Sequence, residues 1–116
     1  MTLLIVLNRP PYDGTDVTWN ALRLAGQSLE AGLGVRIFLM NDSIDLARED
    51  CRPPEGGEDL QGMLCDLVAR GAEAKFCKTC LNRCGISRAA PIPEVAEGTM
   101  PALAEWIAES ERVISF

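Results

Sequence analysis

The sequence predicts one α/β domain over residues 1–116, with an open, mostly parallel sheet flanked by helices. Three observations favour this fold class. Leu3–Leu7 (LLIVL) is a continuous apolar run without alternation, which is typical of a parallel strand covered on both faces. Similar short runs alternate with stretches in which apolar residues recur at helical spacing. A chain of 116 residues has the size of one compact domain and is too short for two.

A strand and a helix open the predicted fold. Leu3–Leu7 is expected to be a central strand, and the turn-forming sequence NRPPYDG follows at residues 8–14. Thr15 can cap the helix that comes next. The inward-facing positions of this helix are Val17, Ala21, Leu24, Ala25, Ser28 and Leu29.

A second strand follows, because Gly32 and Gly34 stop the helix. Val35–Met40 (VRIFLM) predicts this strand, and Asn41–Ala47 predicts a short turn or helix. Two prolines and two glycines in Cys51–Glu58 (CRPPEGGE) then predict a surface loop.

The second half of the chain predicts two more helices and two more strands. One amphipathic helix has its apolar positions at Leu60, Met63, Leu64, Leu67 and Val68. Ala72–Phe76 predicts the third strand. Thr99 can cap a last helix with Leu103, Ala104 and Ile107 inward, and Arg112–Phe116 (RVISF) predicts a terminal strand.

The composition excludes several classes of function. The net charge of −6 argues against a nucleic-acid partner, because phosphate binding depends on clustered Lys and Arg. The sequence has no run of about 18 apolar residues and no signal-peptide pattern, so a cytoplasmic location without a membrane partner is expected. Histidine is absent, which removes Cys-His nucleophile pairs and imidazole-dependent zinc sites. In a reducing compartment the five cysteines should be thiols unless they bind metal or are catalytically oxidised.

Three of the cysteines lie close together in the sequence FCKTCLNRCGI at residues 76–86. Cys77 is expected to be the first residue past the third strand, at the edge of the sheet where α/β folds gather ligand chemistry. Residues 74–93 contain no Asp or Glu, and their basic residues are Lys75, Lys78, Arg83 and Arg88. Basic neighbours, or a helix beginning after Cys77, would favour the reactive thiolate.

The residues alone leave three interpretations of these thiols open. Cys77 and Cys80 have zinc-finger spacing, but Cys84 supplies only a third ligand where a closed site needs four. The pair can form a redox disulfide, although the Trp-Cys-Gly-Pro surroundings of thioredoxins are absent. The third interpretation is an accessible nucleophilic thiol that carries sulfur as a persulfide.

The order of several motifs resembles that of the DsrE/DsrF/TusD-like sulfur-relay family, whose fold is also called YchN-like. These motifs are the turn Pro10–Gly14 (PPYDG), the strand end Phe38–Asp42 (FLMND) and the closing sequence Glu111–Phe116 (ERVISF). In that family a strand-end cysteine is followed eight residues later by glycine and an aliphatic residue. Cys77 with Gly85-Ile86 is similar.

This resemblance implies a parallel five-stranded α/β sandwich whose subunits form trimers or hexamers. It implies that Cys77 accepts sulfane sulfur from a donor protein and passes it to an acceptor protein, as a sulfurtransferase-like carrier without a cofactor. Two positions depart from the relay pattern. Arg83-Cys84-Gly85 stands where relay members usually have Arg-Arg-Gly, and Cys80 is not required in them. The alternative is therefore a non-catalytic oligomeric module whose cysteines bind a metal or act as a redox pair.

The remaining cysteines divide into two groups. Cys80 and Cys84 can resolve an oxidised Cys77 to a disulfide or line its pocket. Cys51 and Cys65 are expected to be structural, since one lies in or beside a loop and the other packs in a helix.

Four further residues are candidates for contacts with a substrate or partner. Lys78 and Arg83 can steady a thiolate or bind an anionic partner. Tyr12 and Gly14 follow the first strand at the same edge of the sheet and can border the pocket, although a solvated turn is the simpler role.

Overall fold

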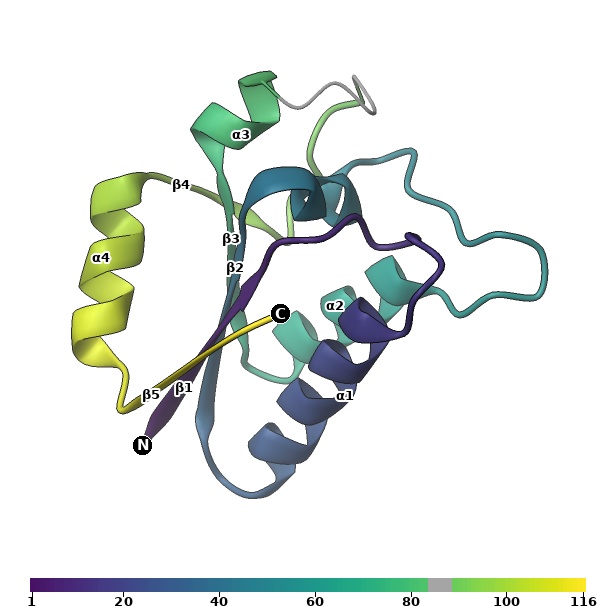
Figure 1. Cartoon of the computed structure of the whole chain (residues 1–116). Coiled ribbons are helices and arrows are strands. Elements are labelled where there is room, and N and C mark those ends of the chain that lie inside the picture. Colours follow the sequence, from purple (N-terminus) through teal and green to yellow (C-terminus); the bar gives the residue numbers. More distant parts are fainter. Residues whose placement is uncertain (84–88) are drawn as a thin grey trace.

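Five parallel strands form the middle layer of the protein, with helices on both faces (Figure 1). The computed structural model describes residues 1–83 and 89–116. The strands are β1 (Thr2–Leu7), β2 (Gly34–Leu39), β3 (Glu73–Cys77), β4 (Ala96–Gly98) and β5 (Arg112–Ser115). Their spatial order is β4-β3-β2-β1-β5, and every neighbouring pair is parallel. The predicted fold class and the interior position of the first strand are therefore confirmed.

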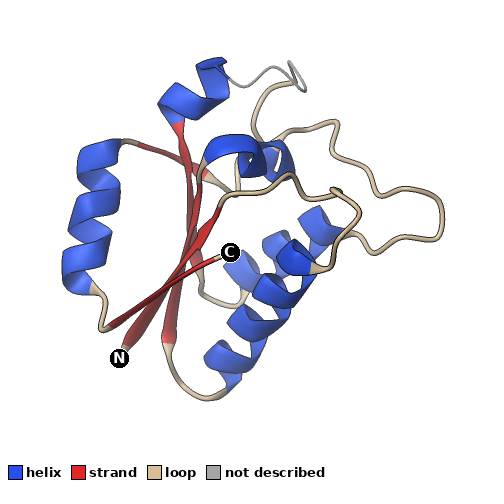
Figure 2. Ribbon diagram, in the orientation of Figure 1, coloured by secondary structure: helices blue, strands red, loops and turns tan. Residues whose placement is uncertain are grey.

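The helices are distributed unequally over the sheet, as Figure 2 shows. Helices α1 (Val17–Glu30) and α2 (Leu60–Ala69) cover one face, whereas α4 (Met100–Glu109) covers the other. The 3₁₀-helix η1 (Asn41–Ala47) and the short helix α3 (Lys78–Arg83) lie at the carboxyl ends of the strands. Within the described parts of the chain, none of the helices is long and apolar enough to cross a membrane.

Two apolar cores result from the alternation of side chains along β1. Leu3, Ile5 and Leu7 are buried in the larger core, which the sheet forms with α1 and α2. Leu4 points to the opposite face and joins a smaller core under α4. The other buried members of this smaller core are Phe38, Cys77, Leu103 and Trp106.

Packing in the smaller core is tight around Phe38, which is fully buried. Its ring meets that of Trp106 edge to face, with the centroids 6.1 Å apart and the planes at 85°. A Cβ atom added to Gly98 would lie 2.9 Å from Phe38 Cε2. Glycine at this position therefore lets β4 approach the Phe38 ring.

Three residues predicted to face inward are exposed instead. Leu24 lies on the outer side of α1, because Ala21, Leu22 and Ala25 form the stripe that contacts the sheet. Ala104 and Ile107 lie on the outer side of α4. The indole of Trp106 takes the inward position of that helix because it packs against Phe38.

Of the two residues predicted to cap helices, Thr99 is an N-cap in the structure and Thr15 is not. Thr99 caps α4 as expected, since its hydroxyl oxygen accepts a hydrogen bond from Ala102 N–H at 3.2 Å. Thr15 is not the N-cap of α1, which is Asp16. The Thr15 hydroxyl donates to Asp13 Oδ1 at 2.6 Å, within the preceding turn, and its oxygen accepts from Val17 N–H at 3.4 Å.

The third strand runs one residue further than predicted, so Cys77 is the last residue of β3 rather than the first residue beyond it. The structure also contains β4, which has no counterpart among the strands predicted from the residues. This strand places Gly98 beside Cys77 at the edge of the sheet.

Candidate functional site

Cys77 is buried at the junction of β3 and α3. Its side chain belongs to the smaller core, and the residue is only 3% exposed. The persulfide interpretation calls for an accessible thiol, and Cys77 is buried in this structure. The cause is the alternation of β3, which turns the thiol toward the face covered by α4, where Leu103 and Trp106 pack.

Cys80 lies in the first turn of α3 and is partly exposed. Its backbone N–H donates a hydrogen bond to Cys77 Sγ at 3.4 Å. Its own Sγ accepts a hydrogen bond from the backbone N–H of Asn41 at 3.2 Å. Cys80 also packs against both apolar cores, so it sits at the end of the sheet between the two faces. The structure thus brings together two of the three predicted thiols.

Asn41, whose N–H makes this contact, has an unusual backbone conformation. Its φ is +53°, in the left-handed region that few residues other than glycine and asparagine adopt. Its side-chain Nδ2 donates to Asn8 Oδ1 at 2.9 Å, and Asn8 Nδ2 donates to the carbonyl oxygen of Phe116 at 3.2 Å. Sequence reasoning assigned no role to Asn8 or Asn41, although Asn41 belongs to the FLMND motif.

Arg48 is a second residue that sequence reasoning missed. Its side chain is buried and pairs with Asp45, with Arg48 Nε 2.8 Å from Asp45 Oδ1. The same guanidinium donates to the carbonyl oxygen of Leu81 in α3 at 3.3 Å and to that of Ala89 at 3.0 Å. One buried cation therefore holds α3 and the chain after residue 88 against η1.

The two predicted cationic residues are exposed on α3. Lys78 Nζ lies 3.8 Å from Glu97 Oε1 on the neighbouring strand β4. Glu97 lies outside residues 74–93, the segment without Asp or Glu. Its carboxylate offsets part of the positive charge of the basic residues in that segment. Arg83 is the last residue of α3. Both positions leave the cations at the surface rather than beside the buried Cys77 thiol.

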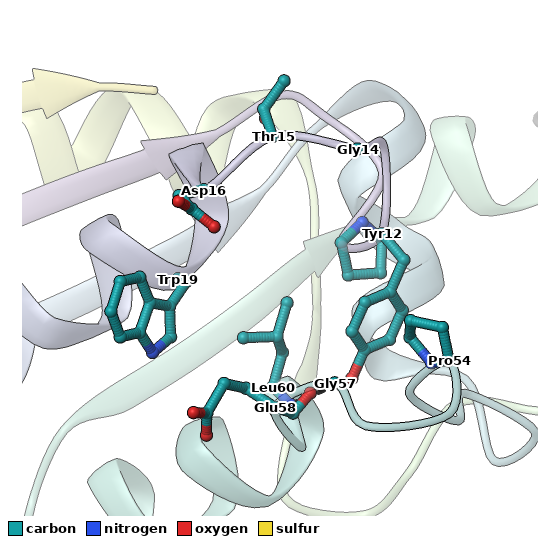
Figure 3. A pocket seen from close by; sticks show the side chains of 10 residues that line it. Tyr12, Gly14, Thr15, Asp16, Trp19, Pro54, Gly57, Glu58 and Leu60 are labelled. Atoms are coloured by element: carbon teal, nitrogen blue, oxygen red, sulfur yellow. Dashed lines mark hydrogen bonds between the residues drawn. The ribbon is translucent and has the colours of Figure 1, made fainter.

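Tyr12 and Gly14 line a cavity of about 520 Å³ between the start of α1 and the loop before α2 (Figure 3). The Tyr12 hydroxyl donates to the carbonyl oxygen of Glu58 at 2.8 Å and accepts from Leu60 N–H at 3.0 Å. Burial raises the pKa of this hydroxyl. Neither Cys77 nor Cys80 lines this cavity, so the structure groups Tyr12 with Gly14 but not with that pair of thiols.

Cys51 and Cys65 lie apart from the pair and are partly buried. Burial raises the pKa of Cys51 from its ordinary value of 9.0 to about 11, and nearby Asp45 and Asp50 add to the effect. Burial also raises the pKa of Cys65. Neither environment favours a reactive thiolate, which agrees with a structural role.

Cys51 should therefore react far more slowly with an alkylating reagent in the folded protein than in urea. Only the thiolate reacts, and raising the pKa from 9.0 to about 11 lowers the thiolate fraction about 100-fold near pH 8. The reaction should speed up as the pH approaches the raised pKa. Peptide mapping by mass spectrometry after timed alkylation between about pH 7 and 10 measures this. Equal rates in buffer and in urea would contradict it.

Among the described cysteines, Cys51, Cys65 and Cys77 are free thiols. Among residues 1–83 and 89–116, no group of three or more Cys, Asp or Glu side chains is arranged to hold a metal ion. Cys84 and Gly85-Ile86 lie outside the described residues, so their predicted roles are not addressed by the structure.

Known proteins resemble this chain over its whole length. The family model described as DsrE/DsrF-like family matches residues 1–116. Protein YchN of Escherichia coli is 37% identical over 116 residues, covering 98% of this chain and 97% of the relative. An uncharacterized protein of Methanopyrus kandleri is 34% identical over 114 residues, covering 98% of this chain and 93% of the relative.

Solved structures show the same architecture. The crystal structure of YchN from Escherichia coli matches with a TM-score of 0.84 and 34% identity, covering 100% of this chain and 99% of that one. A conserved protein of unknown function from Bacteroides thetaiotaomicron matches with a TM-score of 0.71 at 18% identity, covering 99% of this chain and 94% of that one. The second likeness concerns the fold alone.

Proposed function

The chain belongs to the DsrE/DsrF-like family, and we propose on this basis that it is a sulfur carrier in which Cys77 holds sulfane sulfur as a persulfide. The observation that carries the proposal is the place of Cys77. It ends β3 at the carboxyl edge of a parallel sheet, and its Sγ accepts a hydrogen bond from Cys80 N–H.

The proposed chemistry is an exchange of sulfur between thiols. A thiolate of the protein attacks the outer sulfur of a donor persulfide, the sulfur–sulfur bond of the donor breaks, and the donor leaves as a thiolate that takes up a proton. The sulfur is then held as a persulfide on Cys77. The new persulfide on Cys77 is later attacked at its outer sulfur by an acceptor thiolate, which returns Cys77 to its starting form. No electrons are gained or lost overall.

The surroundings of Cys77 support this chemistry in two ways. The Cys80 N–H donates a hydrogen bond to Cys77 Sγ at 3.4 Å and so holds the sulfur in place at the end of β3. Burial under Trp106 and Leu103 shields a bound persulfide from other thiols in solution. A sulfur atom placed there is held rather than lost, as a carrier requires.

Contacts with the donor and acceptor proteins belong to the same proposal. Lys78 and Arg83 are exposed on α3, where they can meet an anionic partner. Tyr12 and Gly14 remain candidates for substrate contact, through the cavity that they line. Cys84 remains a candidate for resolving an oxidised Cys77.

We also propose self-association into a trimer or hexamer, in a cytoplasmic setting. Three apolar side chains support an association surface around α4 and β5, because each is more than a third exposed. They are Met100, Ile107 and Val113. A reducing compartment suits a protein in which Cys51, Cys65 and Cys77 are free thiols.

Intact-protein mass spectrometry after incubation with a sulfane-sulfur donor tests the proposed function. The wild-type protein should gain the mass of one or more sulfur atoms and keep it during brief treatment with a thiol, whereas any gain by Cys77→Ser should be lost in that treatment. Cys65→Ser is the matched control, because it removes a partly buried thiol elsewhere and should load as the wild type does. If wild-type protein purified without metal gains no sulfur, the proposal is wrong. A stoichiometric metal lost on replacing Cys80 would favour the metal-binding module instead.

A further inference from the structure

The buried position of Cys77 raises the question of which thiol meets the donor. A donor persulfide must bring its outer sulfur into contact with the attacking thiolate. Cys77 is 3% exposed and lies under α4, so a donor protein cannot reach it directly in this conformation. Cys80 is partly exposed and lies beside it, with its amide nitrogen 3.4 Å from Cys77 Sγ.

We propose that sulfur enters through Cys80 and reaches Cys77 by a second exchange within the pair. This inference rests on the proposed function, because it assigns the order in which the two thiols act. Cys80 is suited to the first role because it packs against both cores at the end of the sheet, and so lies between the solvent and the buried thiol.

The two steps balance without a reductant. In the first, the Cys80 thiolate attacks the outer sulfur of the donor persulfide, the donor sulfur–sulfur bond breaks, and the donor thiolate leaves and is protonated. In the second, the Cys77 thiolate attacks the outer sulfur now on Cys80. The Cys80 sulfur–sulfur bond breaks, which leaves a persulfide on Cys77 and a thiolate on Cys80.

Asn41 is the positioning residue for Cys80 in this scheme. Its N–H, 3.2 Å from Cys80 Sγ, stabilises the thiolate that attacks in the first step and leaves in the second. Asn41 makes this contact with a φ of +53°, so the chain that follows the N–H turns in the left-handed region. The bond from Asn41 Nδ2 to Asn8 Oδ1 fixes this conformation to the end of β1.

The experiment compares initial rates of sulfur loading from glutathione persulfide, followed by intact-protein mass spectrometry. All variants carry Cys84→Ser, so that only the described thiols differ. Cys77→Ser should take up sulfur on Cys80 at close to the parent initial rate, and reduction with a thiol should remove it more readily than from the parent. Cys80→Ser should load Cys77 at least an order of magnitude more slowly. A brief treatment of the unloaded parent with iodoacetamide should label Cys80 before Cys77.

The outcomes separate this inference from the proposed function. If Cys80→Ser loads as fast as the parent, entry through Cys80 is wrong while the carrier function stands. If the parent itself gains no sulfur, the carrier function fails and the inference fails with it. Conversion of the loaded parent to a Cys77–Cys80 disulfide with release of sulfide, before any persulfide forms on Cys77, would also overturn the inference, because Cys77 would then have attacked the inner sulfur on Cys80.

Two substitutions of Asn41 test its positioning role. Glycine adopts positive φ without strain, whereas valine is β-branched and does not. Asn41→Gly should therefore keep the N–H near Cys80 Sγ, and Asn41→Val should turn it away. The pH midpoint of Cys80 alkylation should rise in Asn41→Val and remain close to the parent value in Asn41→Gly. An unchanged midpoint in Asn41→Val, in protein shown to be folded by circular dichroism, would overturn the role of Asn41.

Discussion

Arg48→Met should lower the free energy of unfolding by about 3–5 kcal/mol, because it leaves a buried carboxylate without its cation. The Arg48 guanidinium lies 2.8 Å from Asp45 Oδ1, and both side chains are shielded from water. The carbonyl oxygens of Leu81 and Ala89 would also lose a donor. Urea denaturation followed by circular dichroism measures the loss.

Arg70→Met is the matched control for Arg48→Met. Arg70 also pairs with carboxylates, those of Asp66 and Glu30, but the three side chains are substantially exposed. Its replacement should cost no more than about 1 kcal/mol, since exposed ion pairs contribute little. The double variant Asp45→Leu/Arg48→Met should recover part of the loss, because no unpaired buried charge remains. Equal losses for the two arginine variants would show that the burial of Arg48 has no energetic consequence.

Phe38→Ala should lower the free energy of unfolding by a similar amount, about 3–5 kcal/mol, because it removes a fully buried ring from the smaller core. It should also expose Cys77, whose thiol shares that core with the ring. Alkylation of Cys77 in the folded protein should therefore become faster. Denaturation gives the stability, and peptide mapping after timed alkylation gives the rate.

Ile37→Ala separates these two effects of Phe38→Ala. Ile37 is the neighbouring residue of β2 and is equally buried, but its side chain lies in the larger core on the opposite face. The variant should lose about 2–5 kcal/mol and leave the alkylation rate of Cys77 in the folded protein unchanged. If both variants accelerate alkylation equally, global unfolding rather than the smaller core controls access to Cys77.

The elements with local signals could be predicted from the sequence. The apolar runs of β1 and β2 are typical of buried parallel strands. Thr99 indicates the start of α4, because its hydroxyl oxygen accepts a hydrogen bond from Ala102 N–H. The strand β4 (AEG) could not be recognised, because it is three residues long and contains none of the β-branched or aromatic residues typical of strands. Its pairing with β3 is determined by the rest of the fold.

The candidate site likewise combines features that the nearby sequence predicts with features that depend on distant residues. The position of Cys77 at a strand end is a local property, and the strand predicted at Ala72–Phe76 gives that position to within one residue. Its burial depends on Leu103 and Trp106, which come from a distant part of the sequence. The contacts of Asn41 with Cys80 and of Arg48 with Leu81 likewise join residues 39 and 33 positions apart, and no spacing rule connects such positions.

The pairing of β1 with β5 has a consequence for biosynthesis. Leu3 lies opposite Arg112, and Asn8 bonds to Phe116, 108 positions further along the chain. A nascent polypeptide leaves the ribosome with β1 first, so one edge of that apolar strand stays without its partner until the sequence of β5 has emerged. Such high contact order slows folding and prolongs the exposure of an aggregation-prone edge. The polypeptide should therefore depend on chaperones more than a helical bundle of equal length would.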